Sequence, residues 1–218
     1  MWVKICGIRD VDTALVAAQA GADAIGLNFY PGSKRRVDVD EAARIVEALP
    51  ADVTPIGLFV NADVTEIVRI ARECGLHTLQ LHGDEPAELL AELAYAGRFE
   101  LIRAFRVGAA GLAPMEAELA RLQQAGVTLA GCLVDADVQG HYGGTGQTAP
   151  WDLLSREWRA AEWPPLILAG GLTPSNVAEA IRSCRPWGVD VAGGVESAPG
   201  RKEPSLIQEF LQNARDAS

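Results

Sequence analysis

The chain has 218 residues, of which 49 % are hydrophobic and 22 % are charged, so it has the composition of a globular protein rather than a disordered one. Its formal net charge of −10 argues against nucleic acid and anionic membranes as partners, because both are bound through dense Lys and Arg clusters. No apolar run approaches the roughly 20 residues of a membrane helix, and no signal-peptide core is present at the start. We therefore expect a cytoplasmic protein whose partner is a small molecule.

Short apolar runs alternate along the chain with longer segments in which apolar residues recur at helical spacing. The runs that predict strands are Trp2–Cys6, Ala24–Asn28, Val53–Phe59, Thr78–Leu81, Glu100–Phe105, Leu129–Val134, Pro165–Leu168 and Gly188–Val191. The segments that predict helices, one after each strand, are residues 11–20, 40–49, 63–74, 85–96, 112–125, 151–159, 174–184 and 203–216. Eight strand–helix units in succession predict a parallel sheet.

The units average about 27 residues, close to the minimum for a strand, a helix and two short connections. No linker or shift in composition divides the chain. An open nucleotide-binding sheet would carry G-x-G-x-x-G after its first strand, whereas residues 6–10 read Cys-Gly-Ile-Arg-Asp. The sequence therefore predicts an α/β fold, a single compact (β/α)8 TIM barrel that forms one domain over residues 1–218.

Some helix boundaries carry their own signals. Asp84 precedes a Glu-Pro pair, and Thr173-Pro174 offers a capping hydroxyl followed by proline, so both predict helix starts. Gly75 is placed to end the third helix, because glycine adopts the left-handed backbone of a helix C-terminus.

The active site of such a barrel forms at the carboxyl ends of its strands. The polar residues and glycine pairs at those ends are Cys6, Asn28, Asn61, His82, Arg106, Asp135, Gly170-Gly171 and Gly193-Gly194. The glycine pairs follow the seventh and eighth strands, where exposed backbone N–H groups commonly bind phosphate, although turns alone also require glycine. A small phosphorylated substrate is therefore expected.

Two of these residues are candidates for acid–base chemistry, and a third is a candidate lining residue of the pocket. Cys6 shares a strand face with Lys4, whose charge would favour the thiolate; the alternative is a buried small hydrophobe. Asp135 is a candidate general acid if a closed site raises its pKa, or else a solvated carboxylate or helix cap. His82 shares a face with Gln80 and either lines the pocket or satisfies hydrogen bonds in the core.

Two loops stand out. Residues 33–36 read Ser-Lys-Arg-Arg and form either an anion receptor centred on Arg35 or a solvated loop. Residues 136–148 are long and glycine-rich, which is typical of a lid that excludes water, and they include His141 and Tyr142.

The remaining cysteines, Cys74, Cys132 and Cys184, are far apart in sequence, and none forms a zinc-ligand spacing with a histidine. We expect free thiols and no metal site, since a core of this size does not require disulfides.

Taken together and in order, these motifs resemble the phosphoribosylanthranilate isomerase family of tryptophan biosynthesis along nearly the whole chain. The motifs that carry the resemblance are Lys4-Ile5-Cys6-Gly7, Ser33-Lys34-Arg35, Gly57-Leu58-Phe59-Val60-Asn61, Gln80-Leu81-His82-Gly83, Leu133-Val134-Asp135, Tyr142-Gly143-Gly144-Thr145-Gly146, Leu168-Ala169-Gly170-Gly171, Asn176-Val177, Val189-Asp190-Val191 and Gly194-Val195-Glu196.

The resemblance implies an intramolecular oxidoreductase of the aldose–ketose type that performs an Amadori rearrangement without a cofactor, because the substrate's nitrogen serves as electron sink. It assigns Cys6 as general base and Asp135 as general acid, with Arg35 on the anthranilate carboxylate. The other expected substrate contacts are His82, Gly144, Gly146, Gly170, Gly171, Gly193 and Gly194. Gly193 stands where the family commonly has serine, so one hydroxyl contact to phosphate is absent.

Two alternatives stay open. Another phosphosugar-isomerising barrel, such as the histidine-pathway ribotide isomerase or a dual-substrate relative, would use paired aspartates, and Cys6 occupies the position of the first. A non-catalytic barrel that binds phosphorylated metabolites is compatible with the fold alone. The sequence also leaves open whether the chain is a monomer or a homodimer.

Overall fold

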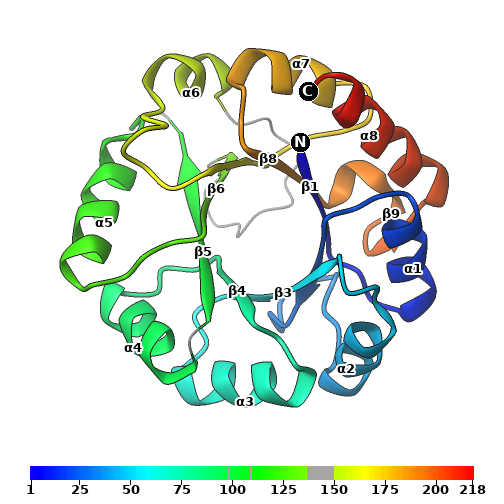
Figure 1. The fold of residues 1–218 in the computed structure, drawn as a ribbon, viewed down its shortest axis with the longest axis horizontal. Helices are drawn as coiled ribbons and strands as arrows, with labels where there is room; N and C mark the ends of the chain where they lie inside the picture. Colours follow the sequence, from blue (N-terminus) through cyan, green and yellow to red (C-terminus); the bar gives the residue numbers. More distant parts are fainter. Residues whose placement is uncertain (98, 109, 137–149) are drawn as a thin grey trace.

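The computed structural model describes residues 1–97, 99–108, 110–136 and 150–218, and it contains a closed barrel of parallel strands ringed by helices (Figure 1). The barrel strands are β1 (Trp2–Cys6), β2 (Ala24–Asn28), β3 (Thr54–Phe59), β4 (Thr78–Leu81), β5 (Glu100–Val107), β6 (Gly131–Ala136), β7 (Leu166–Leu168) and β8 (Gly188–Val191). The helices are α1 (Val11–Gln19), α2 (Val39–Ala48), α3 (Val64–Cys74), α4 (Ala87–Gly97), α5 (Ala113–Gln124), α6 (Trp151–Glu157), α7 (Val177–Cys184) and α8 (Pro204–Asp216).

Each strand pairs in parallel with the next along the chain, and β8 pairs with β1 to close the sheet. In the closing register Lys4 lies opposite Asp190, which brings the first and last strands' charged side chains to the same level. The predicted (β/α)8 TIM barrel is confirmed, since every strand is followed by its helix and no strand of the barrel lacks a neighbour.

The strand residues divide between two sides of the sheet because successive side chains point to opposite faces. On β4, Leu79 and Leu81 belong to the large apolar layer shared with the helices, whereas Gln80 is buried and bonds to Lys4 of β1. A smaller apolar group is separate from that layer: Ala24, Ile56, Ile102, Ala104, Leu133, Ile167 and Ala169. Two of its members pair directly with buried polar residues in the sheet, Ala24 with Lys4 and Ile102 with Gln80.

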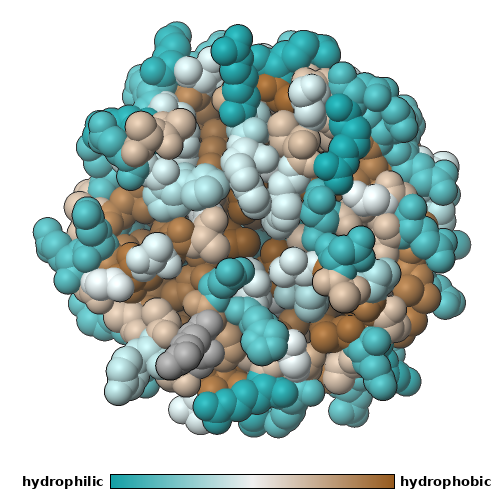
Figure 2. Space-filling model, in the orientation of Figure 1, coloured by the Kyte–Doolittle hydropathy of each residue, from teal (hydrophilic) through white to brown (hydrophobic). Residues whose placement is uncertain are grey.

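The helices have buried apolar faces and exposed polar ones. In Figure 2 hydrophilic side chains lie around the outline of the molecule and apolar ones gather nearer its centre. Asp10, Asp38 and Asp63 cap the first three helices, each accepting a backbone N–H from three residues on, which satisfies a free donor of the first turn. Within the described ranges no helix is both long and apolar enough to cross a bilayer.

Two predicted helix starts are wrong. α7 begins at Val177 after Asn176, and Thr173 instead donates its backbone N–H to the Asn176 side chain, 2.8 Å away. The Asn176 side-chain amide also donates to the Gly171 carbonyl. Residues 173–176 therefore form a turn that is hydrogen-bonded to the preceding glycine loop. The second difference is at α4, which begins at Ala87 instead of at residue 85.

The predicted end of α3 is correct, since Gly75 has the left-handed φ of 70°. One feature has no counterpart in the predicted elements. After β8 the chain forms a short 3-10 turn (η1, Gly193–Val195) and an antiparallel hairpin of β9 (Glu196–Ala198) and β10 (Arg201–Lys202) before α8. This hairpin carries two charged residues of the candidate site.

Candidate active site

The deepest charged group of the barrel is Lys4, which β1 directs into the interior with no solvent exposure. Its ammonium lies 2.8 Å from Asp190 Oδ1 and 2.9 Å from Gln80 Oε1. Burial alone would lower the pKa of Lys4, but the Asp190 carboxylate and the neighbouring Cys6 raise it above its ordinary value. Lys4 therefore stays protonated and places a fixed positive charge beneath the site.

Cys6 lies two residues further along β1, at the barrel mouth, and is 5 % exposed. Gly26 on β2 makes room for it, since a Cβ at that position would stand 2.7 Å from the sulfur. Burial raises the pKa of Cys6, and the opposing effects of Lys4 and Lys202 do not overcome it. Lys4 favours the thiolate as expected, yet burial outweighs it, so the ligand-free protein carries a neutral thiol.

His82, just past β4, is 8 % exposed and lies beside Asp135 of β6. Its Nδ1 is 2.9 Å from Gln80 Nε2, and its Nε2 is 3.8 Å from Asp135 Oδ2. Burial, together with the positive charges of Lys4 and two arginines, lowers the pKa of His82 to about 3. A neutral imidazole therefore faces the buried Asp135 carboxyl.

These contacts connect the two predicted acid–base residues. From Cys6 the connection runs through Lys4 and Gln80 to His82, and from His82 to Asp135. All of these side chains are buried, and their strands lie on different sides of the barrel. The sequence identified both ends of this chain of contacts, but nothing local marked Gln80 as its centre.

Arg35 lies at the rim, where its Nε and Nη2 donate to the two carboxylate oxygens of Glu196 over 2.7 and 2.8 Å. Lys202 also donates to Glu196, over 2.9 Å, and to the Ala192 carbonyl. Burial would raise the pKa of Glu196, but Arg35 and Lys202 lower it below its ordinary value, so it is a carboxylate. Glu196 and Lys202 belong to the β9–β10 hairpin and were not predicted as site residues.

The two predicted phosphate loops meet in space. Gly170 and Gly171 have left-handed φ angles of 81° and 60°, and a Cβ at Gly194 would collide with the Leu172 carbonyl. Gly193 lies against Arg35, with 3.3 Å between its ideal Cβ position and Nη2. The structure thus places both glycine pairs and a guanidinium around one rim. Gly144 and Gly146, with the predicted lid of residues 136–148, lie outside the described residues except for the backbone of Ala136.

Residues 3–213 match the sequence family described as N-(5'phosphoribosyl)anthranilate (PRA) isomerase. The chain belongs to the phosphoribosylanthranilate isomerase family.

The N-(5'-phosphoribosyl)anthranilate isomerase of Roseiflexus sp. (strain RS-1) is 50 % identical to this chain. The alignment covers 99 % of this chain and 98 % of the Roseiflexus chain. The Trichlorobacter lovleyi enzyme of the same name is 43 % identical, over 99 % and 98 %. The Thermotoga maritima crystal structure superposes with a TM-score of 0.85 at 37 % identity, covering 99 % of each chain.

A further phosphoribosylanthranilate isomerase structure contains reduced 1-(o-carboxyphenylamino)-1-deoxyribulose 5-phosphate; it has a TM-score of 0.81 and 36 % identity, and covers 99 % of each chain. The family resemblance drawn from the motifs is therefore confirmed, and this chain is an isomerase of tryptophan biosynthesis.

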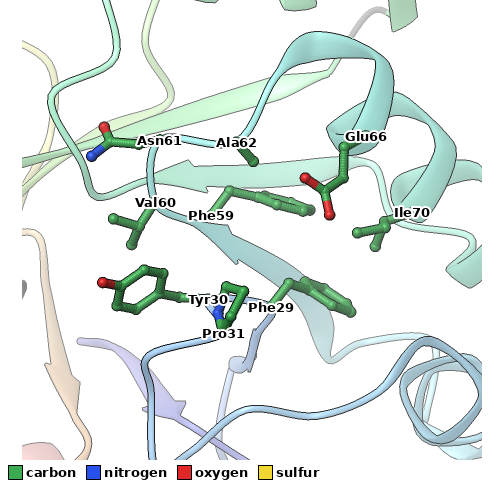
Figure 3. Close-up of a pocket in the computed structure, with 9 residues that line it drawn as sticks. All are labelled: Phe29, Tyr30, Pro31, Phe59, Val60, Asn61, Ala62, Glu66 and Ile70. Carbon is green, nitrogen blue, oxygen red and sulfur yellow. The ribbon is translucent and has the colours of Figure 1, made fainter.

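One pocket lies between α3 and the ends of β2 and β3 and has a volume of about 330 Å³ (Figure 3). Its lining residues are Phe29, Tyr30, Pro31, Phe59, Val60, Asn61, Ala62, Glu66 and Ile70. Tyr30 and Val60 also pack with the apolar group that contains Cys6. Two lining residues of the pocket therefore also contact the apolar group at Cys6.

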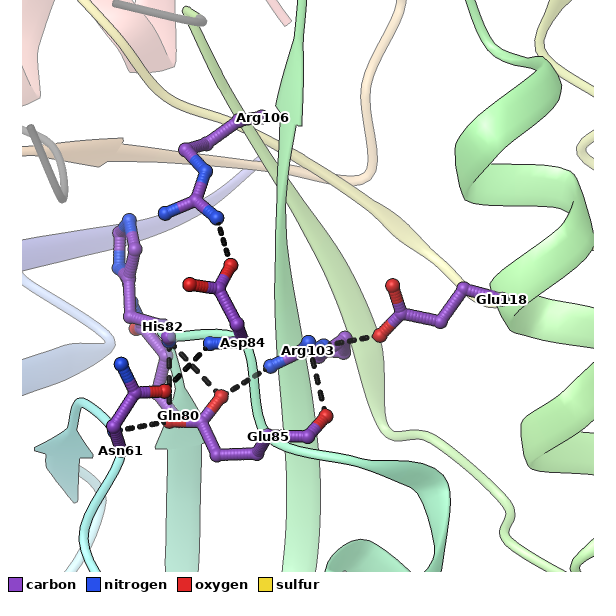
Figure 4. Close-up of polar contacts among 9 residues, drawn as sticks. Asn61, Gln80, His82, Asp84, Glu85, Arg103, Arg106 and Glu118 are labelled. Carbon is purple, nitrogen blue, oxygen red and sulfur yellow. Dashed lines mark hydrogen bonds and ion pairs between the residues drawn. The ribbon is translucent and has the colours of Figure 1, made fainter. Parts of the chain in front are cut away.

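A second charged network supports the strand ends at β3, β4 and β5 (Figure 4). Glu85 is buried, pairs with Arg103, and accepts backbone N–H groups of Asn61 and Gly83. Arg103 also donates to Glu118 of α5 over 2.7 Å. This network was not predicted, because Arg103 is 18 residues from Glu85 and 15 from Glu118 in sequence.

Proposed function

We propose that this chain converts N-(5'-phosphoribosyl)anthranilate to 1-(2-carboxyphenylamino)-1-deoxyribulose 5-phosphate, with Cys6 as general base and Asp135 as general acid. The observation that carries the assignment is the buried connection between those two groups inside a barrel of this family. Since the site draws on the first, sixth and last barrel strands, we also infer that residues 1–218 act as one catalytic domain.

The acid step begins at Asp135. Its carboxyl group delivers a proton to the ribose ring oxygen, the bond from that oxygen to C1 breaks, and the substrate nitrogen and C1 form a Schiff base. His82 is neutral, so it does not hold Asp135 as a carboxylate in the way an imidazolium would.

The base step takes place at Cys6. Cys6 first gives up its thiol proton to solvent, and the resulting thiolate removes the C2 proton. The electron pair of that C–H bond forms the C1–C2 double bond while the C=N π pair returns to nitrogen, and the resulting enolamine tautomerises to the ketone. Burial disfavours a permanent thiolate, but Lys4 stabilises the negative charge as it forms. Lys202 adds a second positive charge nearby.

Substrate binding uses the rim. The Gly170–Gly171 and Gly193–Gly194 loops offer backbone N–H groups for the phosphate, as in other barrel phosphate sites. Arg35 commits two of its five N–H donors to Glu196, which leaves three for the anthranilate carboxylate. Glu196 thus positions the guanidinium rather than blocking it.

The test is the fluorescence change as phosphoribosylanthranilate is consumed. We expect Cys6→Ser and Asp135→Asn each to lower kcat by about 10²- to 10⁴-fold, as for the loss of a general acid or base. Cys184→Ser is the matched control, because it removes another buried thiol far from the barrel mouth. Normal turnover in either site variant would exclude that residue from the mechanism, and no turnover in the folded parent would favour the non-catalytic alternative.

A further inference from the structure

Gln80 is held between two groups whose hydrogen-bonding roles differ. Its Oε1 is 2.9 Å from Lys4 Nζ, and its Nε2 is 2.9 Å from His82 Nδ1. An ammonium has donors only, so the amide oxygen must face Lys4; the reversed amide would set two donors against each other. The Gln80 nitrogen therefore faces His82.

This orientation determines where His82 carries its proton. An amide nitrogen donates and does not accept, so Nδ1 must be the unprotonated, accepting nitrogen of the ring. The ring is neutral because it is buried among positive charges, from Lys4 on β1 and from Arg103 and Arg106 on β5. The single ring proton is therefore on Nε2.

The Nε2–H group points toward Asp135 and is buried, and among the residues that the structure describes it has no hydrogen-bond partner. The 3.8 Å between Nε2 and Asp135 Oδ2 is too long for a direct hydrogen bond. It is short enough for one oxygen to lie about 2.8 Å from both atoms. A buried N–H donor without an acceptor destabilises the folded protein. An oxygen atom of a bound ligand could accept this hydrogen bond from the space between Nε2 and Asp135.

We propose that Lys4 and Gln80 are positioning residues that hold His82 as the Nε2–H tautomer, so that His82 donates a hydrogen bond to the substrate oxygen that Asp135 protonates. This inference rests on the proposed function, which supplies a phosphosugar with a ring oxygen and hydroxyls. A neutral donor orients that oxygen without competing with Asp135 as a proton source. His82 would then contact the substrate through Nε2 alone, while Nδ1 accepts a hydrogen bond from the Gln80 amide.

The tautomer is measured by two-bond ¹H–¹⁵N correlation spectra of ¹⁵N-histidine-labelled protein without ligand. The chain has three histidines, and His82→Gln assigns the signal of interest. We expect a neutral Nε2–H ring in the parent between pH 5 and 8. An Nδ1–H ring or an imidazolium in the parent would overturn the proposal, whatever the enzyme's activity.

Gln80→Glu provides the decisive variant, since it keeps the shape and replaces the donor facing Nδ1 by an acceptor. We expect the proton to move to Nδ1, or the ring to become charged, with kcat falling at least tenfold while KM changes less. Gln124→Glu makes the same change at an exposed position of α5 and is the matched control. An unchanged tautomer in Gln80→Glu would overturn the proposal.

The substrate contact is tested separately with reduced 1-(o-carboxyphenylamino)-1-deoxyribulose 5-phosphate, the compound bound in a relative. We expect its binding to shift the His82 Nε2–H proton resonance downfield. Binding that leaves this resonance unmoved would overturn the donor role. Failure of the compound to bind, with the tautomer as expected, would count against the proposed function and leave the positioning by Lys4 and Gln80 supported.

Discussion

The stability of this protein should depend on pH through His82 in a way that one substitution can isolate. In the folded chain burial and adjacent cations lower the pKa of His82 to about 3, whereas in the unfolded chain it has the ordinary value of about 6.5. Below pH 6.5 His82 is therefore protonated in the unfolded chain but stays neutral in the folded chain. The contribution of neutral His82 to the free energy of unfolding is fully present above pH 6.5, and it is lost progressively as the pH falls toward 3.

The magnitude follows from those two pKa values. Between pH 7 and pH 5 the unfolded imidazole becomes almost fully protonated while the folded one stays neutral, which lowers the free energy of unfolding by about 2 kcal/mol. Replacing His82 with Gln removes this titration and leaves every other group in place. Between pH 7 and pH 5 the free energy of unfolding should therefore fall by about 2 kcal/mol more in the parent than in His82→Gln.

The assay is urea unfolding followed by circular dichroism at pH 7, 6 and 5 for the parent, His82→Gln and His77→Gln. His77 is exposed, so its replacement is the matched control and should leave the parent's pH dependence unchanged. Equal slopes in the parent and His82→Gln would refute the reasoning, because they would show that His82 binds protons equally in both states.

Two further predictions concern packing and buried charge. Gly26→Ala should lower kcat while the circular dichroism spectrum stays unchanged. The added Cβ would lie 2.7 Å from the Cys6 sulfur, so the sulfur would have to move. An unaltered kcat would contradict this close packing. Glu85→Gln should reduce the free energy of unfolding in urea by about 3 kcal/mol, because it removes a buried partner of Arg103. Arg69→Ala breaks an exposed pair on α3 and should cost below about 1 kcal/mol, so similar losses in both variants would refute the distinction.

The buried contacts give Cys6 and Asp135 different electrostatic surroundings. Lys4 offers positive charge to Cys6, while the neutral ring of His82 separates that charge from Asp135. Asp190 balances Lys4 from β8, which keeps the barrel interior close to neutral. The arrangement depends on strands that are adjacent in the barrel only because β8 closes onto β1.

The order of strands and helices could be read from the sequence because it is set by local periodicity and local length. Residues at the strand ends, such as Cys6, His82 and Asp135, could be identified for the same reason, since a parallel barrel places all those ends at one mouth. Even the wrong helix start at Thr173 has a local explanation. The Asn176 side chain accepts the backbone N–H of Thr173 and donates to the Gly171 carbonyl, so residues 173–176 form a turn in place of the first helical turn.

What the sequence by itself determined is therefore the barrel, its mouth and the two residue types suited to acid–base chemistry. Only the tertiary structure decided their charge states and partners: Lys4 meets Asp190 across 186 positions of sequence, and Arg35 meets Glu196 across 161. The protonation of His82 follows from burial and from cations on other strands. These are long-range effects, because the pKa of a buried group depends on which charges the closed barrel brings within a few ångströms of it.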